Sequence, residues 1–323
     1  MGDRSGPESR LSRRALFGTG LGRLVRHRLE GLERLGDELP CEGRPERRSA
    51  FDRSRLKEEI RREWGDGDPR PLLGRLEAAA EVLARAAGSG TGQHVLDVGA
   101  GDGNLALALA RRGAAVVAAD LSPAMVERGR ARTAEAGHEV EWHEADVEAL
   151  PFYDDRFDAV LSSFGAIWAS QPGQMVAELT RVCRPGGLIG MAAWSPSGFM
   201  GRVIALARSA TDWPRDVPPP ERWGRYETAY LHLFGLDDLE VFDESMRLEF
   251  ADTEELWSIL SAPPGPLAGA LRRAADCEND LRREALALAE HHGSEANGRL
   301  QVQSAYALML GRRPEWADGP RHA

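Results

Sequence analysis

Residues 95–104 read VLDVGAGDGN, and this stretch decides the fold. Four residues typical of a buried strand, 95–98, run directly into a glycine-rich turn, and a helical pattern begins at Asn104. Glycine at such a turn allows a tight bend and lets the backbone approach a ligand closely. Because the glycines lie between a strand and a helix, they predict a ligand-binding turn more strongly than a glycine-rich run alone would.

Short strands and helices alternate outward from this turn. Strands are expected at 95–98, 115–119, 140–143, 157–162 and 188–194, with helices over 104–112, 122–136 and 172–183, and two later strands near 240–250 and 299–310. Such alternation indicates right-handed βαβ units and a parallel sheet. The sequence therefore predicts an α/β fold: a Rossmann-like, doubly wound, mostly parallel sheet with helices on both faces and a late antiparallel strand.

Three acidic residues lie at the carboxyl ends of three successive predicted strands: Asp97, Asp120 and Asp146. The carboxyl ends of parallel strands meet at one edge of a sheet, so these carboxylates should converge. Asp120 can accept the two hydroxyls of a ribose, and Asp146 can accept an exocyclic adenine amine. Asp97 would repel a pyrophosphate but favour a cationic group, which argues against a nicotinamide-dependent oxidoreductase. The alternative is that each acid only caps a helix or turn.

The motifs, taken in order, resemble the class I S-adenosylmethionine-dependent methyltransferases. The resemblance is closest to the branch that holds the ubiquinone and menaquinone methyltransferases and many small-molecule methyltransferases. The matching stretches are 95–104, 120–125, 145–152, 157–160 and 181–187. The family implies S-adenosylmethionine as cofactor and methyl transfer to a small-molecule acceptor by in-line displacement. A catalytically inactive regulatory module that binds the cofactor is one alternative. A nucleic-acid methyltransferase is another, although SSFG at 162–165 replaces the Asn/Asp-Pro-Pro-Tyr/Phe-type motif expected there.

The resemblance also implies which residues contact the cofactor. They are Asp97, Gly99, Ala100, Gly101, Gly103, Asn104, Asp120, Leu121, Met125, Asp146, Val147, Ser162 and Phe164. No catalytic base can be named with the same support. His143 is the histidine nearest to the site in sequence terms, and the alternative is an ordinary edge or loop histidine. No metal site is expected, because the adjacent His291 and His292 cannot share one helix face.

Residues 195–235 interrupt the regular pattern with five prolines and six aromatic residues. Insertions of this length in compact folds are often lids or binding loops. We expect a substrate lid there, built from Trp194, Phe199, Trp223 and Tyr226, with a local hydrophobic core as the alternative. Trp64 is a candidate for an N-terminal flap over the cofactor.

Composition limits the classes of protein to consider. The chain has 323 residues, a net charge of −10 and three cysteines without metal-ligand spacing. The negative charge disfavours a nucleic-acid binder, and the cysteine usage favours a reducing cytoplasm. Residues 1–30 differ, with seven arginines against three acids, a net of +4. We therefore expect a basic N-terminal extension and linker at 1–60 and a methyltransferase domain at 61–323, with its cofactor-binding core at 93–194.

The basic extension allows three interpretations. Residues 11–36 have apolar residues at helical spacing, which predicts an amphipathic helix docked on the domain or a frayed tail. A weak contact with a membrane surface through the same residues is the second interpretation. The third is a twin-arginine export signal at 12–17, although arginines interrupt the apolar run that should follow. The oligomeric state is not predicted.

Overall fold

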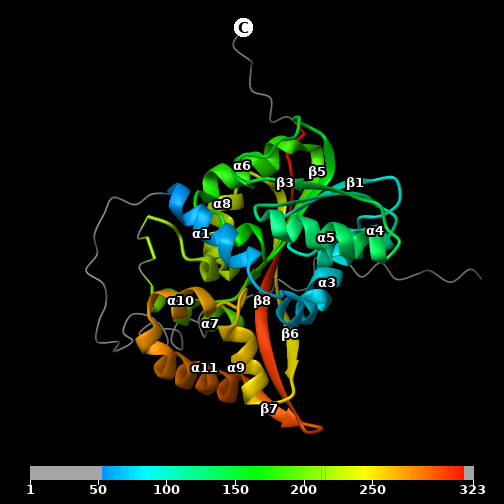
Figure 1. Cartoon of the computed structure of the whole chain (residues 1–323). Coiled ribbons are helices and arrows are strands. Elements are labelled where there is room, and N and C mark those ends of the chain that lie inside the picture. Colours follow the sequence, from blue (N-terminus) through cyan, green and yellow to red (C-terminus); the bar gives the residue numbers. More distant parts are fainter. Residues whose placement is uncertain (1–52, 212, 215, 316–323) are drawn as a thin grey trace, which may run out of the picture. The chain divides into compact units, whose positions relative to one another are not determined.

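The computed structural model describes residues 53–211, 213, 214 and 216–315, and Figure 1 shows their arrangement. One sheet holds every strand of this part of the chain, in the order β3-β2-β1-β4-β5-β8-β6, with β7 paired to β8. The strands are β1 His94–Val98, β2 Ala115–Asp120, β3 Val140–Glu144, β4 Phe157–Ser163, β5 Cys183–Trp194, β6 Asp237–Phe250, β7 Gly293–Ala296 and β8 Arg299–Arg312. The first five run parallel, and β8 is antiparallel to β5 and to β6. The predicted sheet is confirmed.

Helices cover both faces of the parallel part. They are α3 Glu77–Ala87, α4 Asn104–Arg111, α5 Pro123–Glu135 and α6 Pro172–Val182. From β1 the chain proceeds through β2 to β3, toward one edge of the sheet. From β4 it proceeds to β5, toward the other edge. Right-handed crossovers therefore place α4 and α5 on one face and α6 on the opposite face. The strand order reverses between β1 and β4, where open α/β sheets bind their ligands.

The local sequence explains where these helices begin and end. Ser122 caps α5, since its hydroxyl accepts the Met125 amide at 3.5 Å, and Pro123 occupies the first helical position. Gly88 ends α3 in the left-handed conformation, with φ 64°. Capping chemistry of this kind is local and can be read from a few residues.

Two predicted segments can be compared with the elements that the structure shows there. Helix α1, Arg53–Gly65, crosses the expected domain boundary at residue 60, so the end of the predicted linker is helical. The expected lid at 195–235 contains α7 Phe199–Ser209, a 3-10 turn η5 Pro220–Gly224 and α8 Tyr226–Leu233. Both α7 and η5 pack on the sheet. The segment is therefore largely part of the folded core.

The remaining helical elements range from three-residue 3-10 turns to α11, which has 15 residues. They are α2 Arg70–Leu73, η3 Gly74–Leu76, η4 Ala166–Trp168, α9 Thr253–Ser261, α10 Ala268–Arg273, η6 Ala275–Cys277 and α11 Glu278–His292. In Figure 1 the long strands β6 (yellow) and β8 (red) run through the view, with α9 and α11 beside their lower part. None of the helices in the described part of the chain is long and apolar enough to span a bilayer. Residues 11–36 lie outside the described residues.

Candidate cofactor and acceptor site

The glycine turn after β1 is built by backbone conformations that other residues rarely adopt. Gly99, Gly101 and Gly103 have φ values of 62°, 56° and 96°. A Cβ atom on Gly99 would lie only 2.7 Å from the Cα of Gly165, which follows β4. The turns after β1 and β4 are thus in backbone contact at the point where the strand order reverses.

Asp120 holds this turn in place from the end of β2. One carboxylate oxygen accepts the Gly101 amide and the other accepts the Ser122 amide, both at 2.8 Å. Burial raises the pKa of Asp120, and the two amide hydrogen bonds oppose that change. The carboxylate therefore braces the glycine turn and the start of α5 while it lines the pocket.

Asp97, in β1, is the most unusual group of the site. Its side chain is fully buried and lines the same pocket. The backbone amide of Ala106 faces it, but neither carboxylate oxygen accepts a hydrogen bond of ordinary geometry. Burial raises the pKa of Asp97 well above its usual range, and the Asp120 charge raises it further. A buried, unpartnered carboxylate at a pocket wall is suited to a cationic ligand group.

Asp146 follows β3 and is held from both sides. One of its oxygens accepts the Glu148 amide at 2.9 Å, and the other lies 2.6 Å from the Lys57 ammonium. The same ammonium lies 2.6 Å from the Glu148 carboxylate. The sequence analysis missed Lys57 and Glu148 as site residues, although Lys57 is the only lysine in the chain.

The half of the pocket near β4 and β5 is apolar and aromatic. Phe164 stacks on Trp194 with ring centroids 3.8 Å apart and an interplanar angle of 8°. Trp64 of α1 meets Trp168 edge to face with ring centroids 6.0 Å apart, and both residues line the pocket. Phe164 has a φ of 62°, a strained conformation for a residue other than glycine and one that clusters at functional sites.

Most of the predicted cofactor residues line one pocket. They are Asp97, Gly99, Ala100, Gly101, Asn104, Asp120, Leu121, Met125, Asp146, Val147 and Phe164. Gly103 and Ser162 do not line it, and each has a packing role instead. A Cβ on Gly103 would lie 3.1 Å from the Trp142 ring. The Ser162 hydroxyl donates to the Val98 carbonyl at 2.7 Å and accepts the Ala166 amide at 2.9 Å, which ties β4 to β1.

The predicted lid residues separate into two groups. Trp194 lines the pocket, and Met200 and Ile204 of α7 line it without having been predicted. Phe199 and Trp223 do not line it because they are buried in the core, and Tyr226 is 41% exposed outside it. The sequence alone could not separate these groups, because the same aromatic side chains occur in a hydrophobic core and at the wall of a pocket.

His143 is not placed to act as a base. Its ring nitrogen Nε2 lies 2.5 Å from Glu141, its ring packs edge-on against Phe152, and it does not line the pocket. His291 and His292 contact each other edge to face with centroids 4.9 Å apart. Within the described ranges, no group of three or more His, Cys, Asp or Glu residues could hold a metal ion.

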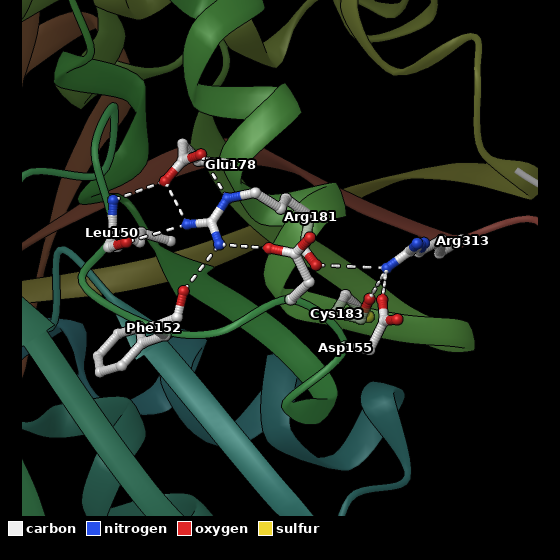
Figure 2. A network of polar contacts seen from close by, with 8 residues as sticks. Leu150, Phe152, Asp155, Glu178, Arg181, Cys183 and Arg313 are labelled. Carbon is white, nitrogen blue, oxygen red and sulfur yellow. Dashed lines mark hydrogen bonds and ion pairs between the residues drawn. The ribbon is translucent and has the colours of Figure 1, made fainter. Parts of the chain in front are cut away.

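A polar network fixes the segment that follows Asp146 (Figure 2). Arg181 of α6 donates to the carbonyls of Leu150 and Phe152 at 2.9 and 2.7 Å, and it pairs with Glu178 at 2.7 Å. Glu178 in turn accepts the Leu150 amide at 2.7 Å. Arg313, just after β8, reaches the same region through the Arg181 and Cys183 carbonyls. The loop that carries Asp146 is therefore anchored to α6.

Comparison with known proteins agrees with this geometry. A family model described as a methyltransferase domain matches residues 95–187. The chain belongs to the class I S-adenosylmethionine-dependent methyltransferases. S-adenosylmethionine is the cofactor of that family. The prediction of family and fold from the glycine turn and the acids at the strand ends is confirmed.

Curated relatives extend the match beyond residues 95–187. The uncharacterised protein Rv1403c of Mycobacterium tuberculosis H37Rv is 36% identical over 220 residues, 67% of this chain and 80% of that protein. Rv1405c of the same strain is 45% identical over 145 residues, 45% of this chain. The match spans about half of Rv1405c, 53% of its length. The demethylmenaquinone methyltransferase of Clavibacter sepedonicus is 46% identical over 114 residues, 35% of this chain and 46% of that protein.

Solved structures share the fold of this chain. BH2331 of Bacillus halodurans C-125 superposes with a TM-score of 0.51 and 21% identity, over 73% of this chain and 99% of that one. YcgJ of Bacillus subtilis gives a TM-score of 0.51 and 20% identity, over 74% and 99%. At this level of identity, the likeness concerns the fold.

Proposed function

We propose that the chain transfers a methyl group from S-adenosylmethionine to a small, largely apolar acceptor. The observation that carries this proposal is the Asp97 carboxylate, which is buried, unpartnered and at the wall of a pocket beside the glycine turn. Such a group gains most from a ligand that brings a positive charge into the pocket. The cofactor has two such groups, its amino group and its sulfonium.

The pocket residues would divide the cofactor between them. Asp97 and the glycine turn would hold the methionine end, and Asp120 would accept the ribose hydroxyls. Asp146 would accept the adenine amine, and Leu121 and Met125 would pack on the ring. When bound, the cofactor supplies an electrophilic methyl group on a positively charged sulfur. The chain's own contribution is to orient the acceptor in line with that group, which can lower a barrier by roughly 7–11 kcal/mol.

The titratable groups at the pocket wall support the choice of acceptor. In the described part of the chain they all come from α1, the ends of β1 to β3 and the segments just after them: Lys57, Asp97, Asp102, Asp120, Asp146 and Glu148. The side formed by Phe164, Trp168, Trp194 and α7 offers aromatic and aliphatic surface. The acceptor should therefore be apolar near its reacting atom. That atom should react without a protein base, as a neutral amine, thiolate, phenolate or enolate does.

Calorimetry with S-adenosylhomocysteine tests the cofactor assignment. Asp120→Asn keeps the size of the side chain but removes its charge, so affinity should fall by roughly tenfold to a hundredfold. Asp276→Asn, at an exposed position away from the pocket, is the control and should bind like wild type. Unchanged affinity in Asp120→Asn would refute the assignment of the site.

Acceptor identity needs a separate experiment. Wild-type protein and a labelled methyl donor would be incubated with cell extract, and mass spectrometry would identify the labelled products. We expect label in a small apolar compound. Label only in nucleic acid would favour that alternative, and cofactor binding without any labelled product would favour a catalytically inactive module.

A further inference from the structure

The chain's only lysine lies at the mouth of the cofactor pocket. Lys57 belongs to α1, and its ammonium lies 2.6 Å from carboxylate oxygens of both Asp146 and Glu148. Its side chain is 26% exposed, whereas that of Glu148 is 2% exposed. Hydrogen bonds and charges of the two acids outweigh partial burial and raise the pKa of Lys57. Lys57 and the two acids thus form a charged contact at the edge of the pocket.

Glu148 connects Lys57 to the aromatic side of the pocket. Its carboxylate accepts the Ser170 hydroxyl at 2.9 Å and the Gln171 backbone amide at 2.9 Å. These two residues directly follow Trp168 and Ala169, which line the pocket at the end of η4. Lys57 therefore joins three segments of the wall: α1, the loop after β3 and the loop after η4.

Helix α1 is held mainly by polar contacts. Leu56 is its one buried residue among the thirteen. Its glutamates Glu59 and Glu63 pair with Arg273 of α10 at 2.8 and 2.9 Å, and Arg61 pairs with Glu144 at the end of β3. Figure 1 shows α1 in blue, to the left of α5 and above α10. Contacts of this kind are individually weak and depend on salt, so such a helix can detach more easily than one with a large apolar face.

We propose that Lys57 is a positioning residue that latches α1 over the site, holding Asp146 toward the adenine and Trp64 against Trp168. One helix then closes both halves of the pocket, since Lys57 and Trp64 lie two turns apart on it. Opening α1 admits the ligands, and closing it excludes water from the reacting atoms. Because this role presupposes the cofactor site proposed above, its test has to separate failure of the latch from failure of the site.

Chemical modification of the single lysine provides a direct readout. An amine-reactive acetylating reagent would be added to the full chain, and mass spectrometry would follow acetylation of the peptide that contains residue 57. With S-adenosylhomocysteine bound, the closed helix should slow this reaction at least fivefold. Glu148→Gln removes one of the two charges that hold the ammonium, so its unliganded form should react faster than the wild type.

Calorimetry with the same ligand completes the test. Lys57→Met should weaken binding about tenfold, and Lys57→Arg, which keeps the charge, should recover most of the affinity. Arg62→Met removes a positive charge from an exposed position of the same helix and should bind like wild type. An equal loss in Lys57→Met and Arg62→Met would indicate a general charge effect and refute the latch.

The two proposals fail in different ways. If the wild type does not bind S-adenosylhomocysteine, the proposed cofactor site is wrong and the latch falls with it. If the wild type binds but Lys57→Met binds equally well, or if the ligand leaves the acetylation rate unchanged, only the latch is wrong. The acetylation experiment uses the wild type, so it decides the question even if Lys57→Met folds poorly.

Discussion

At the scale of single residues, the burial of Asp97 lowers the stability of the protein without ligand but favours the binding of a cationic ligand. Its carboxyl group is fully buried, so the fold favours the protonated form and raises its pKa. Above the ordinary pKa of about 3.9, the unfolded chain holds fewer protons at this site than the folded chain does. Without ligand, the free energy of unfolding should therefore fall as pH rises from the ordinary pKa toward the raised pKa of the folded state, by up to about 1.4 kcal/mol per pH unit. A cationic ligand reverses this by stabilising the charged form.

Asp97→Asn separates the two effects. Without ligand, the variant should be more stable than wild type near pH 7, and its advantage should shrink toward pH 4, where wild-type Asp97 is protonated in both states. Affinity for S-adenosylhomocysteine should fall at least tenfold. Thermal unfolding at several pH values and calorimetry measure the two changes. An unfolding temperature with the same pH dependence in both proteins would contradict the explanation.

At the scale of elements, the site depends on contact between the turns after β1 and β4. Gly165 has a φ of −83°, which any residue adopts, so only space requires glycine there. A Cβ atom on it would lie 2.1 Å from the Gly99 carbonyl oxygen, far closer than atoms can approach. The separation of the two turns is thus fixed by the absence of one methyl group.

Gly165→Ala should force the turns apart. We expect a loss of roughly 1–3 kcal/mol in the free energy of unfolding and a large loss of cofactor affinity. Gly173→Ala is the matched control, because a Cβ in this exposed first turn of α6 meets nothing within 4 Å. It should leave stability unchanged or raise it by about 0.4–1 kcal/mol. Denaturant unfolding and calorimetry measure both, and equal stability in the two variants would contradict the steric argument.

The η5 turn belongs to the core, and Trp223 shows this. Its side chain is 1% exposed and packs on His232 with ring centroids 5.0 Å apart. Trp223→Ala should lower the free energy of unfolding by about 3–5 kcal/mol through the cavity it leaves. Tyr230→Ala, at a 49% exposed position of the neighbouring helix, should change it by no more than about 0.5 kcal/mol. A normal unfolding temperature with a raised acceptor KM in Trp223→Ala would restore the lid interpretation.

At the scale of the whole molecule, the Arg181 network joins α6, the loop after β3 and the end of β8 (Figure 2). Arg181 lowers the pKa of Glu178 through a direct hydrogen bond. A depressed carboxyl pKa contributes stability at neutral pH that is lost as pH falls from about 4.5 through the folded-state value. The same contact thus links acid stability to the position of the Asp146 loop.

Arg181→Met should remove the guanidinium from Glu178, which keeps only the Leu150 amide, and leave the Leu150 and Phe152 carbonyl oxygens without this donor. We expect a loss of about 2 kcal/mol in the free energy of unfolding at pH 7, and a smaller further loss than in wild type between pH 5 and 3. Arg111→Met, whose exposed side chain pairs with Glu81 at 3.4 Å, should cost less than about 1 kcal/mol. Urea unfolding at several pH values measures the free energy of unfolding of both variants. An unaltered pH profile in Arg181→Met would show that the network has no role in acid stability.

Much of the fold and of the cofactor side could be predicted from the sequence because the deciding features are local. The glycines after 95–98, the cap at Ser122 and the alternation of strands and helices each involve neighbouring residues. Asp97, Asp120 and Asp146 lie at or just after the carboxyl ends of adjacent parallel strands, so their convergence could also be derived.

Which aromatic residues line the pocket, and which residues Lys57 contacts, were decided only by tertiary structure. Trp194 and Trp223 are both buried aromatic residues, and only packing puts one at the pocket wall and the other in the core. Lys57 meets Asp146 across 89 positions of sequence, and no spacing rule relates a helix before the first strand to a loop after the third. Local chemistry fixes what each element is, whereas contacts between distant elements depend on how all of them share one core.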